Sequence, residues 1–582
     1  MKRKVLTICV TMLALAAMAV AADQPQQSGA FNNVVDQMIA QESQNMKALR
    51  QYSPIVETYI QDMRPDKEMG SVPDGDDYFL GRVSFAAGLK DRSFLTKKSR
   101  WRFDPFHPVV RLVRGEYSSR GFAQMAVIDN DGLSRQKYDF HYVGRDFLGE
   151  LRCIVIDISP KKHAGKGLFK GRVWVEDQGY NIVRFNGTYS PQPMMGRYLH
   201  FDTWRLNTAP GVWLPAYIYS EESDVHLGLV HKVTYKAETR LWAYDVGVAT
   251  NNSQFTAVEV DTNDQVKDES ENPQDLSPIE SQRAWERQSE DNALQRLQTA
   301  GLLAQPGDVD KVLETVINNL EITNNLNIDP PVRARVLLTS PIESFTVGHT
   351  IVVSRGLLDV LPDEASLAAI LARELAHIVL AHDTKTQFAF ADRLAFPDNE
   401  TLQKLNFTES PAEAAAADKK AVEFLKNSPY KDKLADVGLF MRQLQSRQKE
   451  LPNLIRARLG NALTLRDGQV HLAALESQAP ALQPANLKQI AALPLGGRIK
   501  VDPWSDSIDM TKNKAVALNS PDEKMPFEVT PLFPYLTRYN QSPQENAAGQ
   551  AGQTPTKVKN VNMKTTPGGG TNVPVDTASR NR

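Results

Sequence analysis

The chain has 582 residues, more than a single hydrophobic core usually spans, so two or three domains are expected. Hydrophobic residues make up 41% and charged residues 23%, which is the composition of a globular protein and argues against disorder throughout. The formal net charge of −2 argues against a strongly basic nucleic-acid-binding protein, so no nucleic-acid partner is expected.

Residues 1–22 have the pattern of a secretory signal peptide. Met1 to Lys4 is basic, Val5 to Val20 is apolar and uncharged, and small residues follow up to Ala22. A retained membrane anchor is the alternative, but the short apolar core and the small residues favour cleavage. No later segment offers about 18 uninterrupted apolar residues, so no transmembrane span is expected after cleavage. The sequence predicts a periplasmic or secreted protein.

Residues 23–77 are predicted to form a helical lead-in, because apolar residues recur at helical spacing between Asn33 and Met63. From residue 78 to 249 the pattern changes to short alternating strands separated by turn residues such as Glu176–Gly179. This region predicts one large, curved, half-barrel-like antiparallel sheet. Residues 250–277 are acidic and poor in large apolar residues, as in a linker.

A mainly helical domain is predicted over residues 278–477, followed by a β-rich extension over residues 478–540 that includes Gly497–Val501 and Phe527–Thr530. The tail, residues 541–582, has no aromatic residue and is predicted to be disordered. The expected fold class is therefore α+β, with an N-terminal antiparallel sheet domain and a C-terminal mainly helical domain that ends in a short β-rich stretch.

Residues 373–377 read Arg-Glu-Leu-Ala-His, the zinc-protease pattern H-E-x-x-H with arginine in place of the first histidine. In the intact motif two histidines one helical turn apart hold the metal, and the glutamate polarises the attacking water. Arg373 stays protonated and has no lone pair to give, so it cannot act as that ligand. A helix that begins near Asp363 and Glu364 is predicted to carry the motif.

The segment from Val309 to Leu444 resembles the zinc metallopeptidase family of HtpX, the CAAX prenyl protease and BepA. The resemblance rests on a strand at Val347–Val353, the run Val-Ser-Arg-Gly-Leu-Leu at 353–358, the helix with Glu374–His382, and a later Ala-Asp helix. It implies a gluzincin-like peptidase domain.

The resemblance places the family's first histidine ligand on Arg373, its general-base glutamate on Glu374 and its second histidine ligand on His377. The third ligand in the family is a glutamate four residues before a helical aspartate. That aspartate matches Asp418, so the ligand position falls on Ala414. Two of the three zinc ligands are missing by residue type, and no metal or other cofactor is expected, with zinc as the alternative.

Other residues near the motif are candidate atypical ligands. Glu413 is adjacent to the third position, and His382 lies five residues after His377, but each is rotated by about 100° on an ideal helix. The matched strand, which in the family binds substrate backbone beside the metal, supplies a further histidine in Val347, Gly348 and His349.

Arg373 itself has two interpretations. Without a metal, Glu374, Asp418 and Glu413 would be acids in a partly buried site, which is unfavourable unless they are paired. We expect Arg373 to form a salt bridge to Asp418 or Glu413 and to replace the metal as the link between two helices. The alternative is an arginine without fixed partners in an inactive site. In both cases Glu374 is expected to be vestigial as a base.

Residues 78–249 have a weaker resemblance to lipoprotein carriers of the LolA/LolB type, which are half-barrels with a concave apolar face for acyl chains. It rests on Phe140–Arg145, Cys153–Pro160 and Lys170–Asp177, and it assigns no binding residue.

Together these patterns predict an exported, non-catalytic pseudopeptidase that binds envelope proteins or lipoproteins. One alternative is an active metalloendopeptidase with atypical metal ligands. A second alternative is a lipid or lipoprotein carrier, which requires a continuous apolar concave face on residues 78–249.

Overall fold

The computed structural model describes most of the chain between residues 29 and 539. The described residues are 29–67, 70–86, 90–93, 119–191, 198–227, 231–244, 278–382, 406–465, 468–483, 499–501, 508–510, 527–532 and 534–539. The predicted signal peptide, acidic linker and disordered tail lie outside them. Contacts divide the chain into residues 1–538 and 539–582, and all described helices and strands belong to the first unit. No helix among the described residues has the length and apolar character needed to cross a membrane.

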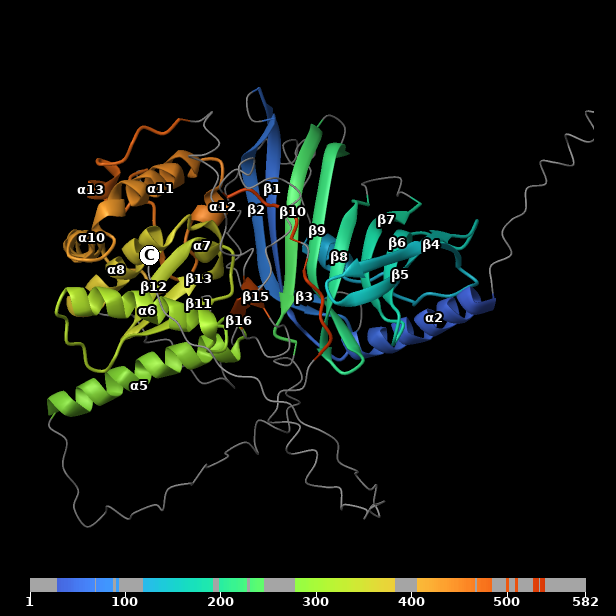
Figure 1. Ribbon diagram of the computed structural model, residues 1–582, viewed down its shortest axis with the longest axis horizontal. Helices are drawn as coiled ribbons and strands as arrows, with labels where there is room; N and C mark the ends of the chain where they lie inside the picture. The colour runs from blue at the N-terminus through green and yellow to red at the C-terminus, as the bar shows by residue number, and fades with distance from the viewer. Residues whose placement is uncertain are drawn as a thin grey trace, which may run out of the picture. The chain divides into compact units, whose positions relative to one another are not determined.

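A ten-stranded antiparallel sheet dominates the N-terminal part (Figure 1). Its strands are β1 (Ile55–Asp66), β2 (Gly70–Ser84), β3 (Lys90–Ser93), β4 (Tyr138–Leu148), β5 (Leu151–Pro160), β6 (Leu168–Glu176), β7 (Ile182–Ser190), β8 (Phe201–Ala209), β9 (Val212–Leu227) and β10 (His231–Trp242). The order is β3-β2-β1-β10-β9-β8-β7-β6-β5-β4, so the sheet is open, with β3 and β4 at its edges. The predicted α+β class, with a large curved antiparallel sheet, is confirmed.

The predicted helical lead-in over residues 23–77 is wrong beyond its first part. Helix α2 spans Gly29–Leu49, whereas β1 and β2 begin at Ile55 and Gly70. Pro54 stands directly before β1 and disfavours a continuing helix. Residues 55–61 are all buried because both faces of β1 are covered. Their apolar residues therefore do not alternate with polar ones, as they would in a half-buried strand, and their spacing resembles that of a helix.

Each face of the sheet packs against other parts of the chain. We call one the helix face, because α2 and α4 (Ser119–Gln124) lie against it. The other, the strap face, packs against the helices and strands between Pro278 and Glu476, which we call the peptidase-like region. It also packs against residues 527–532 and 534–538, which we call the strap. The aromatic residues Trp174, Trp204 and Trp213 are buried on the strap face and belong to the core.

The peptidase-like region surrounds a small sheet of order β11-β13-β12-β14. Its strands are β11 (Arg333–Leu337), β12 (Glu343–Val347), β13 (Thr350–Ser354) and β14 (Asn461–Ala462). Its helices are α5 (Pro278–Thr299), α6 (Asp308–Thr323), α7 (Arg355–Val360), α8 (Glu364–Val379), α10 (Pro411–Lys426), the short η3 (Lys431–Lys433), α11 (Leu434–Arg447), α12 (Pro452–Ile455) and α13 (Ala473–Glu476). Two short strands, β15 (Ile499–Val501) and β16 (Ile508–Met510), form a separate hairpin.

Two predicted strands have a different structure. The expected strand Val347–Val353 is a hairpin of β12 and β13, because Gly348 has a φ of +56° and reverses the chain. The expected strand Phe527–Thr530 is the start of the strap, and its described residues pair with no strand. Its backbone groups bond instead to side chains of the large sheet, as described below.

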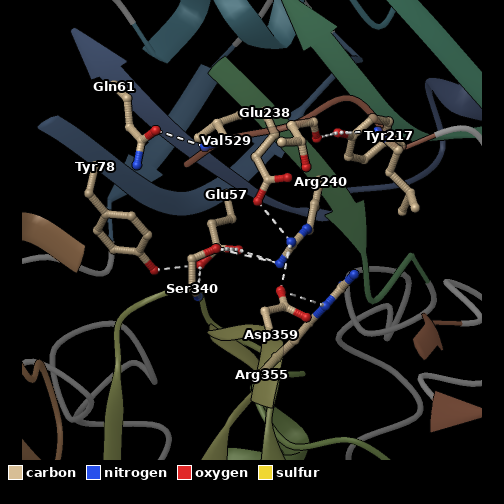
Figure 2. Close-up of polar contacts among 12 residues, drawn as sticks. Glu57, Gln61, Tyr78, Tyr217, Glu238, Arg240, Ser340, Arg355, Asp359 and Val529 are labelled. Carbon is tan, nitrogen blue, oxygen red and sulfur yellow. Dashed lines mark hydrogen bonds and ion pairs between the residues drawn. The ribbon is translucent and has the colours of Figure 1, made fainter. Parts of the chain in front are cut away.

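A buried ionic cluster joins the large sheet to the peptidase-like region (Figure 2). Glu57 on β1 accepts hydrogen bonds from the backbone nitrogen of Ser340 at 2.6 Å and from its hydroxyl at 2.9 Å. Arg240 on β10 lies 2.7 Å from Glu238, 3.2 Å from Asp359 on α7 and 3.8 Å from Glu57. Glu57 is fully buried and Arg240 is largely buried, so these contacts between the two regions are only weakly screened by solvent.

Candidate functional site

The degenerate motif lies on α8, a helix buried along most of its length. The helix starts at Glu364, as predicted, and Asp363 caps its N-terminus by accepting a hydrogen bond from the Ser366 nitrogen. The helix packs against α6, α10, α11 and the small sheet, and every residue from Ala365 to His377 is buried. Arg373 and Glu374 therefore project into protein and not into solvent.

Arg373 is fully buried and holds two carboxylates. Its Nε donates to Asp418 Oδ1 at 3.0 Å, and its Nη1 donates to Glu374 Oε1 at 2.9 Å. Burial acts to lower the pKa of Arg373, but the charges of Glu374, Asp418 and Glu409 raise it above its ordinary value. The predicted salt bridge to Asp418 is present, and it links α8 to α10.

Asp418 also receives contacts from the segment before α13. His471 Nδ1 lies 2.9 Å from Asp418 Oδ2, and the Leu472 nitrogen donates to the same oxygen at 3.1 Å. Burial acts to raise the pKa of Asp418, but the contacts with His471 and Arg373 outweigh it and lower the pKa below its usual range. Asp418 is thus an ionised group at the junction of α8, α10 and the α13 segment.

Glu374, at the position of the family's general base, is fully buried and already engaged. Its Oε1 accepts from Ser344 Oγ on β12 at 2.7 Å as well as from Arg373. Burial raises the pKa of Glu374, and the charge of Arg373 opposes this rise. One oxygen of this carboxylate is therefore held by two donors of the protein itself.

Glu409, which the sequence reasoning missed, completes the group of charges. Its Oε1 lies 3.9 Å from His377 Nδ1, and its backbone nitrogen donates to Asn461 on β14. Burial and the negative charge of Glu374 raise the pKa of Glu409 to about 8. Its only sequence signal is an acid just before the Ser-Pro that starts α10. The same limit applies to His471 and Ser344, which lie far from the motif in sequence.

His377 is a neutral, buried imidazole. Burial, the charge of Arg373 and the nearby His382 lower its pKa to about 3. The Nδ1 atoms of His377 and His382 lie 2.8 Å apart, so one donates a hydrogen bond and the other accepts it. The expectation that His382 lies 100° around the helix is wrong, because α8 ends at Val379 and Ala381, with a φ of +52°, turns the chain back.

The other predicted site residues do not join this group in the way a ligand would. Glu413 forms the capping box of α10 with Ser410, and Ala414 is buried without a polar side chain. His349 lies half-buried in the β12–β13 turn, with its Nδ1 2.7 Å from the Pro330 carbonyl oxygen. Gly348 occupies the same turn, so of the predicted substrate strand only Val347 is in a strand.

The residues present do not fit a catalytic zinc site. Such sites use three protein ligands and a water molecule, and of the three family positions only His377 offers a lone pair. Arg373 fills the first position with a fixed cation, and Ala414 leaves the third without a donor. Among the described residues, no group of three or more His, Cys, Asp or Glu side chains is arranged to hold a metal ion.

The strand next to the site is covered along part of its length. β14 pairs with Glu343 and Ser344 of β12, so this end of β12 is not a free edge. Further along, Phe345 stacks on Phe407 with ring centroids 4.7 Å apart. The Glu343 carboxylate also accepts from three successive backbone nitrogens at 458–460 and anchors the covering segment. A substrate backbone would have to displace these contacts to pair here.

Comparison with known proteins confirms the main resemblance. Residues 304–398 match the family described as peptidase family M48, and they include α8 and its degenerate motif. No curated protein matches the chain.

Two solved structures are similar to parts of the chain. A putative outer membrane lipoprotein-sorting protein domain from Vibrio parahaemolyticus has 11% identity, with 34% of this chain and 88% of that chain covered. A DUF1329 family protein from Desulfovibrio piger also has 11% identity, with coverages of 38% and 96%. The TM-score is 0.18 in both cases, which is too low to support an argument about fold or function.

Proposed function

Starting from the M48 peptidase match of residues 304–398, we propose that this chain is a non-catalytic pseudopeptidase that binds envelope proteins or lipoproteins. The observation that carries the proposal is the buried guanidinium of Arg373, paired with both Glu374 and Asp418. A fixed cation at this place repels a divalent metal ion and occupies the carboxylate that would polarise water. Peptide hydrolysis would therefore lack its Lewis acid, and its base would be held in an ion pair through one oxygen.

The cover over β12 supports the same conclusion. In the resembling peptidases this strand binds substrate backbone, whereas here Asn461 and Ala462 pair with its first residues and Phe407 stacks on Phe345. Binding of partners is therefore assigned to other surfaces of the chain. The exported location belongs to this proposal too, and it rests on the basic and apolar pattern of residues 1–22.

Neither alternative function has a comparable observation in its favour. An active metallopeptidase would need Glu413 or His349 as ligands, but Glu413 lies in a helix cap and His349 in a turn where it contacts the Pro330 carbonyl. A lipid carrier would need a continuous open apolar face on the large sheet. In the described part of the chain, helices cover one face, and the strap and the peptidase-like region cover the other.

Metal content and proteolysis test the proposal together. The purified full chain, incubated with zinc and desalted, is expected to retain far less than one zinc per chain and to leave labelled casein intact. The matched control is Arg373→His with Ala414→Glu, which restores the family's ligand types and is expected to retain close to one zinc per chain. Labelled unfolded casein is expected to bind the wild type without being cut, as measured by fluorescence anisotropy.

The proposal fails if the wild type retains stoichiometric zinc and cleaves casein in a chelator-sensitive way. Glu374→Gln decides whether such cleavage comes from this site, because it removes the base while keeping the shape of the side chain.

A further inference from the structure

The strap crosses the large sheet instead of extending it. Its contacts begin at Gln61 on β1, continue at Lys236 on β10 and Tyr217 on β9, and end at Glu176 on β6 and at Glu150 beside β5 (Figure 1, red). The ten strands form their complete ladder with one another. The backbone pairing of the sheet therefore does not depend on the strap.

The sheet holds the strap mainly by its backbone. The Gln61 side-chain amide donates to the Phe527 carbonyl oxygen and accepts from the Val529 nitrogen at 2.7 Å (Figure 2). The Tyr217 hydroxyl accepts from the Leu532 nitrogen at 3.2 Å, and the Glu150 nitrogen donates to the Leu536 carbonyl oxygen at 2.9 Å. Contacts to backbone groups are available to any extended peptide, so this recognition tolerates different sequences.

Side chains of the strap supply the specificity. Phe527, Val529 and Leu536 are buried in the same core as the aromatic residues of the strap face, and Leu536 is fully buried. Charged contacts flank them, because Glu528 pairs with Lys236 and Arg538 lies 2.7 Å from Glu176.

One turn of the sheet is shaped to accept the strap. Gly149, with a φ of +66°, sits so close to the strap that an added Cβ would lie 2.5 Å from the Leu536 carbonyl oxygen. Alanine there would combine backbone strain with a collision against the strap. The close approach and the side-chain clamps on the backbone are features of a peptide-binding surface.

We propose that the strap face is a docking surface for an extended segment of a partner protein, and that the strap is the resident ligand which such a segment displaces. The fitting segment has apolar side chains spaced like Phe527, Val529 and Leu536, with an acidic residue for Lys236 and a basic residue for Glu176. This surface is distinct from the centre around Arg373, so the inference stands whether or not that centre cleaves peptides.

The test uses the full chain with a specific protease site inserted between residues 519 and 520, folded intact and then cut. The cut protein is expected to keep its strap bound without a covalent link and to exchange it for a labelled peptide of residues 525–540, seen as a rise in anisotropy. The uncut protein is expected to show no rise, because its tethered strap competes at high effective concentration.

Two variant peptides make the test specific. Leu536→Asp places a charge at a fully buried position and is expected to weaken exchange by about 100-fold. Tyr535→Asp makes the same charge change at a side chain that is 45% exposed, and it is expected to compete within about threefold of the natural peptide.

Three outcomes would overturn the inference. The cut protein could show no exchange with peptide up to about 100 μM, it could unfold on losing the strap, or the two variant peptides could compete equally. The first two would make the strap a permanent part of the core. None of them bears on metal content or casein cleavage, so failure here is distinct from failure of the proposed function.

Discussion

Replacing Arg373 with methionine is expected to lower the free energy of unfolding by about 3 kcal/mol. The guanidinium is fully buried, and so is Glu374, whereas the Asp418 side chain is 22% exposed and keeps His471 and Leu472 as partners. Removing one partner of a buried ion pair costs roughly 3–5 kcal/mol, because the other charge is left uncompensated. The lower end applies, since Glu374 already has a raised pKa and can take up a proton.

Equilibrium unfolding of the variant and of the wild type in guanidinium chloride measures this difference in the free energy of unfolding. Arg373→Met combined with Glu374→Gln removes the stranded charge and is expected to recover at least about 1 kcal/mol. The matched control is Arg172→Met, which breaks an ion pair to Asp157 whose side chains are 44% and 46% exposed and is expected to cost less than about 1 kcal/mol. If Arg373→Met costs no more than this control, the guanidinium does not neutralise the site and the reasoning is wrong.

Other substitutions test the remaining charges and the strap. Glu409→Gln should change the pH dependence of the free energy of unfolding. Because the pKa of the Glu409 carboxyl rises from 4.5 to about 8 on folding, the folded wild type binds a proton between these pH values and loses stability as the pH rises from 4.5 to 8. From pH 5 to pH 8, the free energy of unfolding of the variant should therefore rise by at least about 2 kcal/mol relative to that of the wild type. If the two free energies change in parallel with pH, this reasoning is wrong. Arg240→Met removes the cation that pairs with Glu57 and two other acids, so it should lower the free energy of unfolding by about 3 kcal/mol in the same denaturation experiment. A loss under about 1 kcal/mol would mean that the cluster is solvated. Gly149→Ala should release the strap and make it at least tenfold more sensitive to limited proteolysis, and unchanged protection would show that the turn adapts without strain.

The part of the site carried by one helix was predictable from sequence. The helical pattern around Arg373, with the resemblance that matches Asp418 to a helical aspartate, predicts that Arg373 faces an acid on a neighbouring helix. The structure forms that ion pair at 3.0 Å. The prediction succeeded because both residues lie on regular helices, in the order of motifs that the resemblance gives.

The rest of the site depends on contacts that local patterns do not encode. Glu409 lies before a helix, His471 before a short one, and Ser344 on a strand, and tertiary packing alone brings them to Arg373 and Asp418. The strand predicted at Phe527–Thr530 is wrong, because its partners are not a neighbouring strand but side chains such as Gln61, more than 460 residues earlier in the chain. The spacing of residues along the sequence does not predict contacts between positions so far apart.

Arginine can link the two helices in place of a metal only because acidic side chains, those of Glu374 and Asp418, surround it. A zinc ion holds two helices together through ligands on each, and Arg373 connects α8 to α10 through Asp418, with Glu374 as a second acceptor. Lysine would offer a single ammonium, whereas the planar guanidinium directs separate N–H groups to two carboxylates. The substitution thus keeps the charge balance and the helix linkage while removing the lone pairs that catalysis needs. Loss of the metal ligands alone would leave Glu374 and Asp418 without a cation, so the two ion pairs of Arg373 are the argument that this residue is a structural link between the helices.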